Sequence, residues 1–272
     1  MQKIDPIIIS KLKPQDDEIL DLDKYLVNPD IEVEKPSPIL YYSNGAENYS
    51  IFTEDNISMI QGRAKSRKST LIRAIGIAIA RGDYQLLKSS YDRNKLAIFD
   101  TEQGHYHCWR AANMIKRMGG HIKYYRISEL STKQKKSIVE LHLRNNEDCG
   151  FIILDNIVHF LSDFNSAIES SELNQWLIKL KSQYNTHINL VLHENGNNIN
   201  GKAKGHIGTL LENTCETIIR VEKDKDDKTR SIVSAKEMRD LEFPPFILEV
   251  DYQGVPYLSP YTMQSETNKS RL

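Results

Sequence analysis

The sequence predicts an α/β fold with a mostly parallel central sheet flanked by helices and with antiparallel strands toward its C-terminal end. Two observations predict it. From about residue 50, short apolar runs alternate with amphipathic helical patterns, an order typical of parallel strands joined by right-handed crossovers. After residue 216, strand-like runs follow one another without helices between them.

The strands of the parallel part are expected as short, nearly continuous apolar runs, because such strands are buried on both faces. They cover residues 57–60, 96–99, 122–127, 151–154 and 189–192. Helices are expected over residues 69–81, 106–118, 132–144 and 171–184. The later strands cover residues 217–221, 230–235, 246–250 and 255–258, and the charged run KDKDDKTR between the first two predicts a solvated hairpin turn.

Composition divides the chain into one domain with two flanking segments. Residues 1–45 are interrupted by prolines and rich in charge, which favours an arm or linker. Residues 46–260 form the expected domain, and residues 261–272 a disordered tail. No signal peptide or membrane span is recognised, so we expect a cytoplasmic protein without membrane contact.

Charge and cysteine content argue against a protein that binds nucleic acid through its overall charge, and against a disulfide-rich or zinc-ribbon protein. Lys and Arg number 36 against 37 Asp and Glu, a formal charge of -1, so any contact with nucleic acid must come from local patches. The three cysteines, Cys108, Cys149 and Cys215, form no C-x-x-C pair, which argues against a disulfide framework or a zinc ribbon. His105, His107 and Cys108 cluster at a helix start, but no second ligand pair accompanies them.

The segment QGRAKSRKST, residues 61–70, has most of the pattern of a phosphate-binding loop, G-x-x-x-x-G-K-[ST]. In such a loop the lysine reaches the outer phosphates and the hydroxyl ligates Mg²⁺ at a helix N-terminus. Arg67 replaces the second glycine, where a side chain crowds the loop unless its backbone is already helical. The alternative is a basic turn. The nucleotide-binding residues expected here are Gly62, Arg63, Ala64, Lys65, Ser66, Arg67, Lys68, Ser69 and Thr70.

Three more apolar strands end in polar residues that belong at the same edge of a parallel sheet. KLAIFDTEQG places Glu102 where a carboxylate can orient and deprotonate a water that attacks the γ-phosphate; the alternative is that Asp100 or Glu102 caps the next helix. GFIILDN ends in Asp155, a candidate for the Mg²⁺ shell together with Ser69. INLVLHEN ends in His193, near the expected γ-phosphate.

The Gly- and Asn-rich stretch GNNINGKAKGHIG, after His193, carries Lys202, Lys204 and His206 and few acids. Two interpretations are open: a mobile segment that contacts nucleic acid or a neighbouring subunit, or a solvated loop.

The order of these motifs resembles a RecA-type P-loop ATPase, and more narrowly the RepA-like branch of hexameric helicases found on plasmids, phages and mobile elements. The resemblance covers roughly residues 40–250 and implies ATP and Mg²⁺ as cofactors, with Glu102 as the catalytic base and Asp155 as the metal-site carboxylate. It also implies a nucleotide at a subunit interface, to which a neighbour supplies cations from a late strand. Arg239, then Lys236, and Arg220 in reserve, are the candidates; ordinary exposed cations are the alternative.

Two functions are open, the first implied by the resemblance and the second favoured by Arg67 and by the proline-rich arm at residues 1–45. The first is an ATPase that assembles into a hexameric ring or filament and acts on DNA, expected to be single-stranded, in replication or mobilisation of a plasmid or mobile element. The second is a nucleotide-gated loader or adaptor with slow hydrolysis that docks on a helicase, primase or transposition protein. A small-molecule kinase is a third possibility, but the sequence has no basic lid beyond residues 195–206.

Overall fold

The computed structural model describes residues 23, 26–33, 35, 38–194 and 205–261. Its contacts divide the chain into two units, Met1–Lys35 and Pro36–Leu272. In the first unit the described residues are all exposed. Every element below belongs to the second unit.

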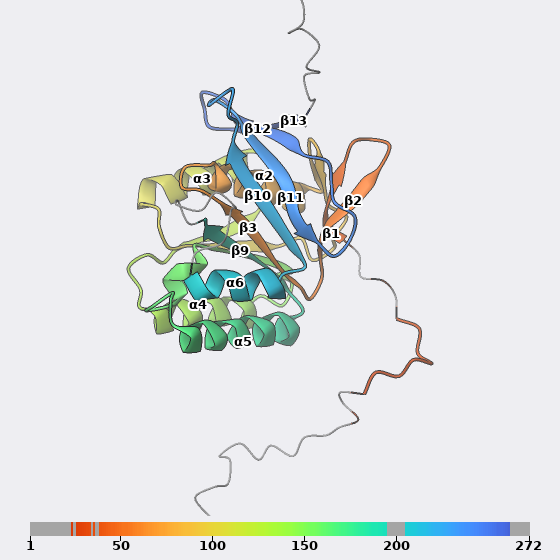
Figure 1. Ribbon diagram of the computed structural model, residues 1–272, viewed down its shortest axis with the longest axis vertical. Helices are drawn as coiled ribbons and strands as arrows, with labels where there is room; N and C mark the ends of the chain where they lie inside the picture. Colours follow the sequence, from red (N-terminus) through yellow and green to blue (C-terminus); the bar gives the residue numbers. More distant parts are fainter. Residues whose placement is uncertain (1–22, 24–25, 34, 36–37, 195–204, 262–272) are drawn as a thin grey trace, which may run out of the picture. The chain divides into compact units, whose positions relative to one another are not determined.

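A nine-stranded sheet forms the centre of the described domain, in the order β13-β12-β11-β10-β3-β9-β8-β6-β7 (Figure 1). The strands from β10 to β7 pair in parallel, and β10 to β13 pair antiparallel, which confirms the predicted fold class. Their bounds are β3 Ile57–Gly62, β6 Leu96–Asp100, β7 Ile122–Arg126, β8 Phe151–Asp155, β9 His187–His193, β10 Thr217–Lys223, β11 Ser231–Met238, β12 Phe246–Val250 and β13 Pro256–Pro260.

Helices cover both faces of this sheet. Figure 1 shows α2 (Lys68–Arg81) and α3 (His105–Arg117) on one face, and α4 (Thr132–Arg144), α5 (Ala167–Tyr184) and α6 (Gly205–Thr214) on the other. Successive strand residues serve opposite faces. Ile98 and Ile153 belong to the core with α2, whereas Phe99 and Leu154 belong to the core with α4 and α5. Of the helices that the structure describes, none has the length and apolar character that a bilayer crossing needs.

Helix α5 begins before the expected residue 171. It begins at Ala167, because the Ser166 hydroxyl accepts a hydrogen bond from the backbone N–H of Glu169 and so caps the first turn. The start of α4 agrees with the prediction, and there Ser131 and Gln134 form a reciprocal capping box.

The structure has a second, four-stranded sheet that was not predicted. Its first strand lies within the expected arm, and no strand was expected at the positions of the other three. Its order is β2-β1-β5-β4, from β1 (Pro38–Ser43), β2 (Asn48–Thr53), β4 (Asp83–Tyr84) and β5 (Leu87–Lys88). Ile39, Leu40 and Tyr42 of β1 are buried in the α2 core. Residues 38–45 therefore belong to the folded unit, and the expected arm at 1–45 is too long at its C-terminal end.

The carboxyl ends of β3, β6, β8 and β9 meet at one edge of the central sheet. In the strand register Asp100 pairs with Asp155, and Gly62 pairs with His193. This edge therefore collects the polar residues that follow each strand.

Candidate functional site

Gly62 ends β3, residues 63–67 form the turn at this edge, and Lys68 to Thr70 begin α2. Lys65 and Arg67 have left-handed backbones, with φ of 64° and 75°. Gly62 is required by close packing, because a Cβ atom there would lie 2.2 Å from the carbonyl oxygen of Val221 in β10. The loop thus curls tightly at the start of a helix, the arrangement that presents backbone N–H groups to an anion.

Arg67 adopts the left-handed conformation that a glycine takes without strain, with φ 75° and ψ 26°. For another residue this conformation costs about 1–2 kcal/mol. The side chain leaves the loop, since its Nη1 donates to Oγ of Ser231 at 2.9 Å and its Nη2 to the carbonyl oxygen of Lys228 at 3.0 Å. The expectation that this side chain crowds the loop unless its backbone is helical is therefore wrong.

The Lys68 ammonium is buried on the inner side of the loop. Its three donors meet the carbonyl oxygens of Gly62 and Arg63, both at 3.0 Å, and Nδ1 of His193 at 2.9 Å. Burial lowers the pKa of Lys68 to about 8, although the nearby carboxylates favour its charge. The lysine is thus held beside the concave backbone of the loop, where an anion would compete for its donors.

Asp155 ends β8 opposite the start of α2. The Ser69 hydroxyl forms a hydrogen bond with its carboxylate. Burial, with the charges of Asp100 and Glu102, raises the pKa of Asp155 to about 7, against the opposing effect of Lys68. Three carboxylates therefore converge here with one lysine, an excess of negative charge that a divalent cation would offset.

Glu102 follows β6 and lies between two neighbouring strands. Its Oε1 accepts a hydrogen bond from Nδ2 of Asn156 at 3.1 Å, and His193 Nε2 lies 3.4 Å from the same oxygen. The hydrogen bond from His193, with that from Asn156, lowers the pKa of Glu102 to about 2 despite partial burial. Glu102 is therefore ionised at neutral pH and able to accept a hydrogen bond.

His193 connects the lysine to the glutamate. Because Lys68 donates to its Nδ1, the neutral ring carries its proton on Nε2, and Nε2 faces Glu102. The imidazole thus lies between the Lys68 ammonium and the Glu102 carboxylate and contacts both. This is the position at which a contact with the γ-phosphate was predicted.

Asp100 is a bracing residue and does not cap α3. Its carboxylate accepts hydrogen bonds from the backbone N–H groups of Glu102 and Gln103, at 2.9 and 2.8 Å, and from the Tyr124 hydroxyl at 2.7 Å. The N-cap of α3 is Gly104, which has no side chain. Asp100 therefore fixes the turn that presents Glu102.

Sequence reasoning missed three residues that support Glu102. Asn156 binds it directly, Thr101 donates to the Asp155 carbonyl oxygen at 3.1 Å, and His159 places Nε2 3.9 Å from Glu102 Oε1. The Asp155–Asn156 peptide bond is cis. For Thr101 and Asn156 the available signal is position, because each directly follows an acidic strand end, whereas His159 carries no such signal.

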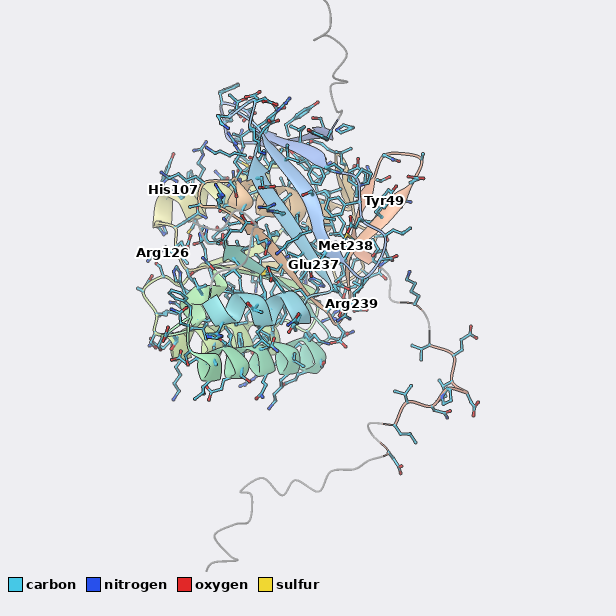
Figure 2. The ribbon with its side chains drawn as sticks, viewed as in Figure 1. Tyr49, His107, Arg126, Glu237, Met238 and Arg239 are labelled. Carbon is cyan, nitrogen blue, oxygen red and sulfur yellow. The ribbon has the colours of Figure 1, made fainter. Side chains whose placement is uncertain are left out.

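The candidate cations lie apart from this cluster. Arg239 follows β11, whose Met238 pairs with Thr217 of β10. Thr217 in turn pairs with Ser58, so Arg239 belongs to the end of the sheet where β3 begins. Figure 2 shows Arg239 on the side of the domain away from His107 and Arg126. Lys236 forms an ion pair with Glu212 of α6. The same subunit thus does not bring Arg239 or Lys236 to Lys68.

Arg220 lies closer to the site, because it pairs with Gln61 in the register of β10 and β3. Its guanidinium is occupied by Glu194 at 2.8 Å and Glu222 at 3.0 Å. Arg220 therefore holds the residue after His193 in place.

Lys202 and Lys204 lie outside the described residues. His206 was expected in a loop, but it lies in the first turn of α6, which begins at Gly205. The prediction of a loop at His206 is wrong, because the apolar residues Ile207 and Leu211 pack this segment against the sheet.

No group of three His, Cys, Asp or Glu side chains with metal-site geometry occurs in the described part of the chain. Cys108, Cys149 and Cys215 are buried free thiols. His105, His107 and Cys108 lie in the first turn of α3.

A groove of about 260 Å³ lies between α3 and the turn that joins β12 to β13, lined among others by Trp109, Tyr106 and Val255. Trp109 is 54 % exposed. Arg73 of α2 links this turn to the loop, because it donates to the Thr70 hydroxyl at 3.0 Å and to the Gly254 carbonyl oxygen at 3.5 Å. An exposed indole on the wall of such a groove can stack on a planar ring.

A larger cavity, of about 530 Å³, lies beside the amino-terminal ends of β6 and β7 and includes Leu96, Ile122 and His142 in its lining. None of the predicted site residues lines it, so this cavity lies apart from the charged groups at the carboxyl ends of the strands.

No family model matches the sequence, and no curated protein matches it. Solved structures match the fold. RadB recombinase aligns with a TM-score of 0.55 at 15% identity, over 77% of this chain and 92% of that one. The flagellar accessory protein FlaH from Methanocaldococcus jannaschii aligns with a TM-score of 0.54 at 12% identity, over 76% and 91%. The domain therefore has a RecA-like α/β fold.

Proposed function

We propose that this chain is a P-loop ATPase that binds ATP with Mg²⁺ and hydrolyses it. The observation that carries the proposal is the meeting of Lys68, Asp155, Glu102 and His193, from four different elements, at one sheet edge next to a tightly curled loop. This is the set of groups that phosphoryl transfer to water requires: a cation, a metal-site carboxylate, a base and a phosphate contact.

The donor set fits Mg²⁺. Ser69 and Asp155 would hold the ion, because a hydroxyl and a carboxylate already in contact are hard oxygen ligands. The raised pKa of Asp155, caused by burial and by Asp100 and Glu102, supports a site that lacks positive charge. When bound, Mg²⁺ supplies charge neutralisation on the phosphates.

The chain's own groups would act as follows. Lys68 exchanges the loop carbonyl oxygens for phosphate oxygens, and its charge offsets the charge that develops during transfer. Glu102, held by Asn156, accepts a hydrogen bond from the attacking water and takes its proton. The water oxygen bonds to the γ-phosphorus as the bond to the leaving ADP oxygen breaks.

The groove beside α3 would hold the nucleotide base. Trp109 offers the ring face, and the contact from Arg110 to the Gln253 carbonyl oxygen, at 2.7 Å, holds the opposite wall. Stacking of this kind tolerates different bases, so discrimination among nucleotides is expected to be weak.

The leading proposal also includes assembly into a ring or filament that couples ATP hydrolysis to action on DNA. Arg239 and Lys236 lie away from their own loop, which suits residues that serve a neighbouring subunit's nucleotide. Lys202, Lys204 and His206 are candidates for contact with single-stranded DNA. One fold neighbour is a recombinase and the other a flagellar accessory protein, so the role in replication or mobilisation of a mobile element rests on the sequence resemblance.

A nucleotide-gated loader or adaptor is the second candidate. It is favoured by the Lys68 ammonium, whose donors are all engaged by the loop and by His193. ATP must displace these contacts, so binding itself would rearrange the site, even where hydrolysis is slow.

The test is steady-state ATP hydrolysis by the purified protein with and without single-stranded DNA, with Glu102→Gln measured beside it. Stimulation by DNA, together with a variant that binds ATP and does not hydrolyse it, is the expected result. Binding without turnover in the wild type favours the adaptor, and absence of binding contradicts both proposals.

A further inference from the structure

Ser231, the first residue of β11, forms hydrogen bonds with two consecutive residues of the loop, Ser66 and Arg67. Its hydroxyl accepts a hydrogen bond from Arg67 Nη1 at 2.9 Å and donates one to the carbonyl oxygen of Ser66 at 3.1 Å. The side chain of Ser231 is fully buried. One buried hydroxyl therefore binds both the Arg67 guanidinium and the backbone of the residue before it.

The β10–β11 hairpin contacts the loop at both ends. At the first loop residue, Gly62 lies against the Val221 carbonyl oxygen of β10. At the last, Arg67 binds Ser231 of β11 and the Lys228 carbonyl oxygen in the connecting turn. The loop connects β3 to α2 in the chain, and packing at Gly62 and hydrogen bonds from Arg67 also hold it against the hairpin.

The turn of this hairpin, residues 224–230, is braced by its own charges. Asp224 is buried and accepts from Arg230 Nε at 2.6 Å and from the backbone N–H of Asp226 at 2.9 Å. Lys228 donates its ammonium to the carbonyl oxygens of Asp224 and Lys225. These bonds hold the Lys228 carbonyl oxygen in position to receive the guanidinium. The hairpin predicted from KDKDDKTR is confirmed, but Asp224 is not solvated.

We propose that Arg67 is a positioning residue that orders the phosphate loop by tying it to the β10–β11 hairpin, so that order in the loop and order in the hairpin are coupled. A glycine adopts the left-handed backbone conformation without steric cost, whereas here the hydrogen bonds of the Arg67 side chain hold the residue in it. Its consequence for affinity rests on the proposed function, because a preformed loop binds phosphate without first losing conformational entropy.

The competing role is direct contact between Arg67 and phosphate. A guanidinium could serve as an additional phosphate ligand. The geometry opposes this role, because both terminal nitrogens are already bonded to the hairpin. The two roles differ in what Ser231 does: the hydroxyl matters to a tether and is irrelevant to a phosphate ligand.

Hydrogen exchange of the nucleotide-free protein tests the tether itself. Ser231→Ala removes the shared hydroxyl and leaves the charge of Arg67, whereas Arg67→Gly removes the guanidinium and accepts the left-handed backbone. Both variants are expected to speed amide exchange about tenfold in residues 63–70 and in residues 224–231. Ser234→Ala, a serine of β11 for which the described residues show no bond to the loop, is the matched control and should exchange as the wild type does.

ATP affinity, measured by calorimetry, tests the consequence. Each of Ser231→Ala and Arg67→Gly is expected to weaken binding about tenfold, and the double variant to be no weaker than Arg67→Gly alone, since both remove one unit. Arg67→Lys keeps the charge without the two-pronged contact and should resemble Arg67→Gly.

Either of two results overturns the proposal: unchanged exchange in both segments of Arg67→Gly, or wild-type affinity in Ser231→Ala beside a loss in Arg67→Gly. Failure of the proposed function is distinguishable, because the wild type would then bind no ATP while the exchange of the two segments still responds to Arg67→Gly.

Discussion

Strand β9 carries a histidine at each end, and the two side chains have opposite surroundings. His187, at the amino-terminal end, is fully buried; its Nε2 lies 2.7 Å from the Ser58 hydroxyl and its Nδ1 2.7 Å from the Thr53 carbonyl oxygen. His193, at the carboxyl end, has a partly exposed side chain and lies between Lys68 and Glu102. Both hydrogen-bond partners of His187 are neutral, although the Glu216 carboxylate lies 3.6 Å from its Nδ1, whereas His193 lies directly between two charged groups.

The pKa values of His187, and of Lys68 and Glu102 beside His193, show how the surroundings of the two histidines differ. Burial lowers the pKa of His187 to about 3, so this ring is neutral and part of a satisfied network. Around His193, burial lowers the pKa of Lys68, and hydrogen bonds lower the pKa of Glu102. The imidazole lies between the ammonium and the carboxylate, so the two charged groups are close but not in direct contact. The amino-terminal edge therefore contributes stability, and the carboxyl edge keeps charged groups available to a ligand.

The largest effect is expected from Lys68→Ala. Loss of the ammonium should weaken ATP binding about 100-fold, or about 3 kcal/mol, because a charge-assisted contact to phosphate is removed. Thermal stability should change little, since the desolvation cost of the buried ammonium is removed together with its hydrogen bonds to the loop carbonyl oxygens. Calorimetric titration and a thermal melt measure both, and a large drop in melting temperature would contradict the separation of the two edges.

His187→Ala should show the reverse pattern. A cavity forms, and the Ser58 hydroxyl and Thr53 carbonyl oxygen lose their partner, so unfolding free energy should fall by about 2–3 kcal/mol. Urea unfolding measures this. His121→Ala, at an exposed histidine, is the control and should stay within about 0.5 kcal/mol of the wild type. The comparison fails if His187→Ala weakens ATP binding as strongly as stability.

Acid should destabilise the protein through His187. Its folded pKa, about 3, lies below the ordinary value of 6.5, so the unfolded chain binds the proton first. The stability from neutral His187 is complete above pH 6.5 and is lost as pH falls, by about 1.4 kcal/mol per pH unit. Asp155, whose pKa burial raises to about 7, acts in the opposite direction. The difference between wild type and His187→Gln in urea unfolding isolates the histidine, and identical slopes would refute its role.

The smallest effect is expected from Asn156→Ala. Glu102 then loses one hydrogen bond but keeps its contact with His193, so turnover should fall about fivefold, near 1 kcal/mol, with ATP affinity retained. Single-turnover hydrolysis and calorimetry separate the two quantities. Unchanged turnover would remove Asn156 from the support of Glu102.

The sequence allowed prediction of the inner parallel strands β3, β6, β8 and β9 because they are apolar runs buried on both faces. The second sheet escaped, since β1 follows a proline-rich segment and β4 and β5 are too short to show a period. At the candidate site, strand-end positions brought Lys68, Glu102, Asp155 and His193 together correctly, and their roles stay predictions.

The direction of Arg67 could not be predicted. Its partner Ser231 is 164 residues away along the chain, and neither residue type signals the contact. Asn156 was within reach of prediction, because it directly follows Asp155 at the same sheet edge.

The exposed position of Trp109 gives the protein an internal optical probe. The chain has two tryptophans, and the other, Trp176, packs on Phe160 and donates its Nε1–H to Glu140 at 2.6 Å on the opposite face of the sheet. A molecule that enters the groove beside α3 would change the emission of Trp109 and leave that of Trp176 as an internal reference. Because Trp109 lines both this groove and the larger cavity, fluorescence of the unlabelled chain can follow the entry of a molecule into either one in real time.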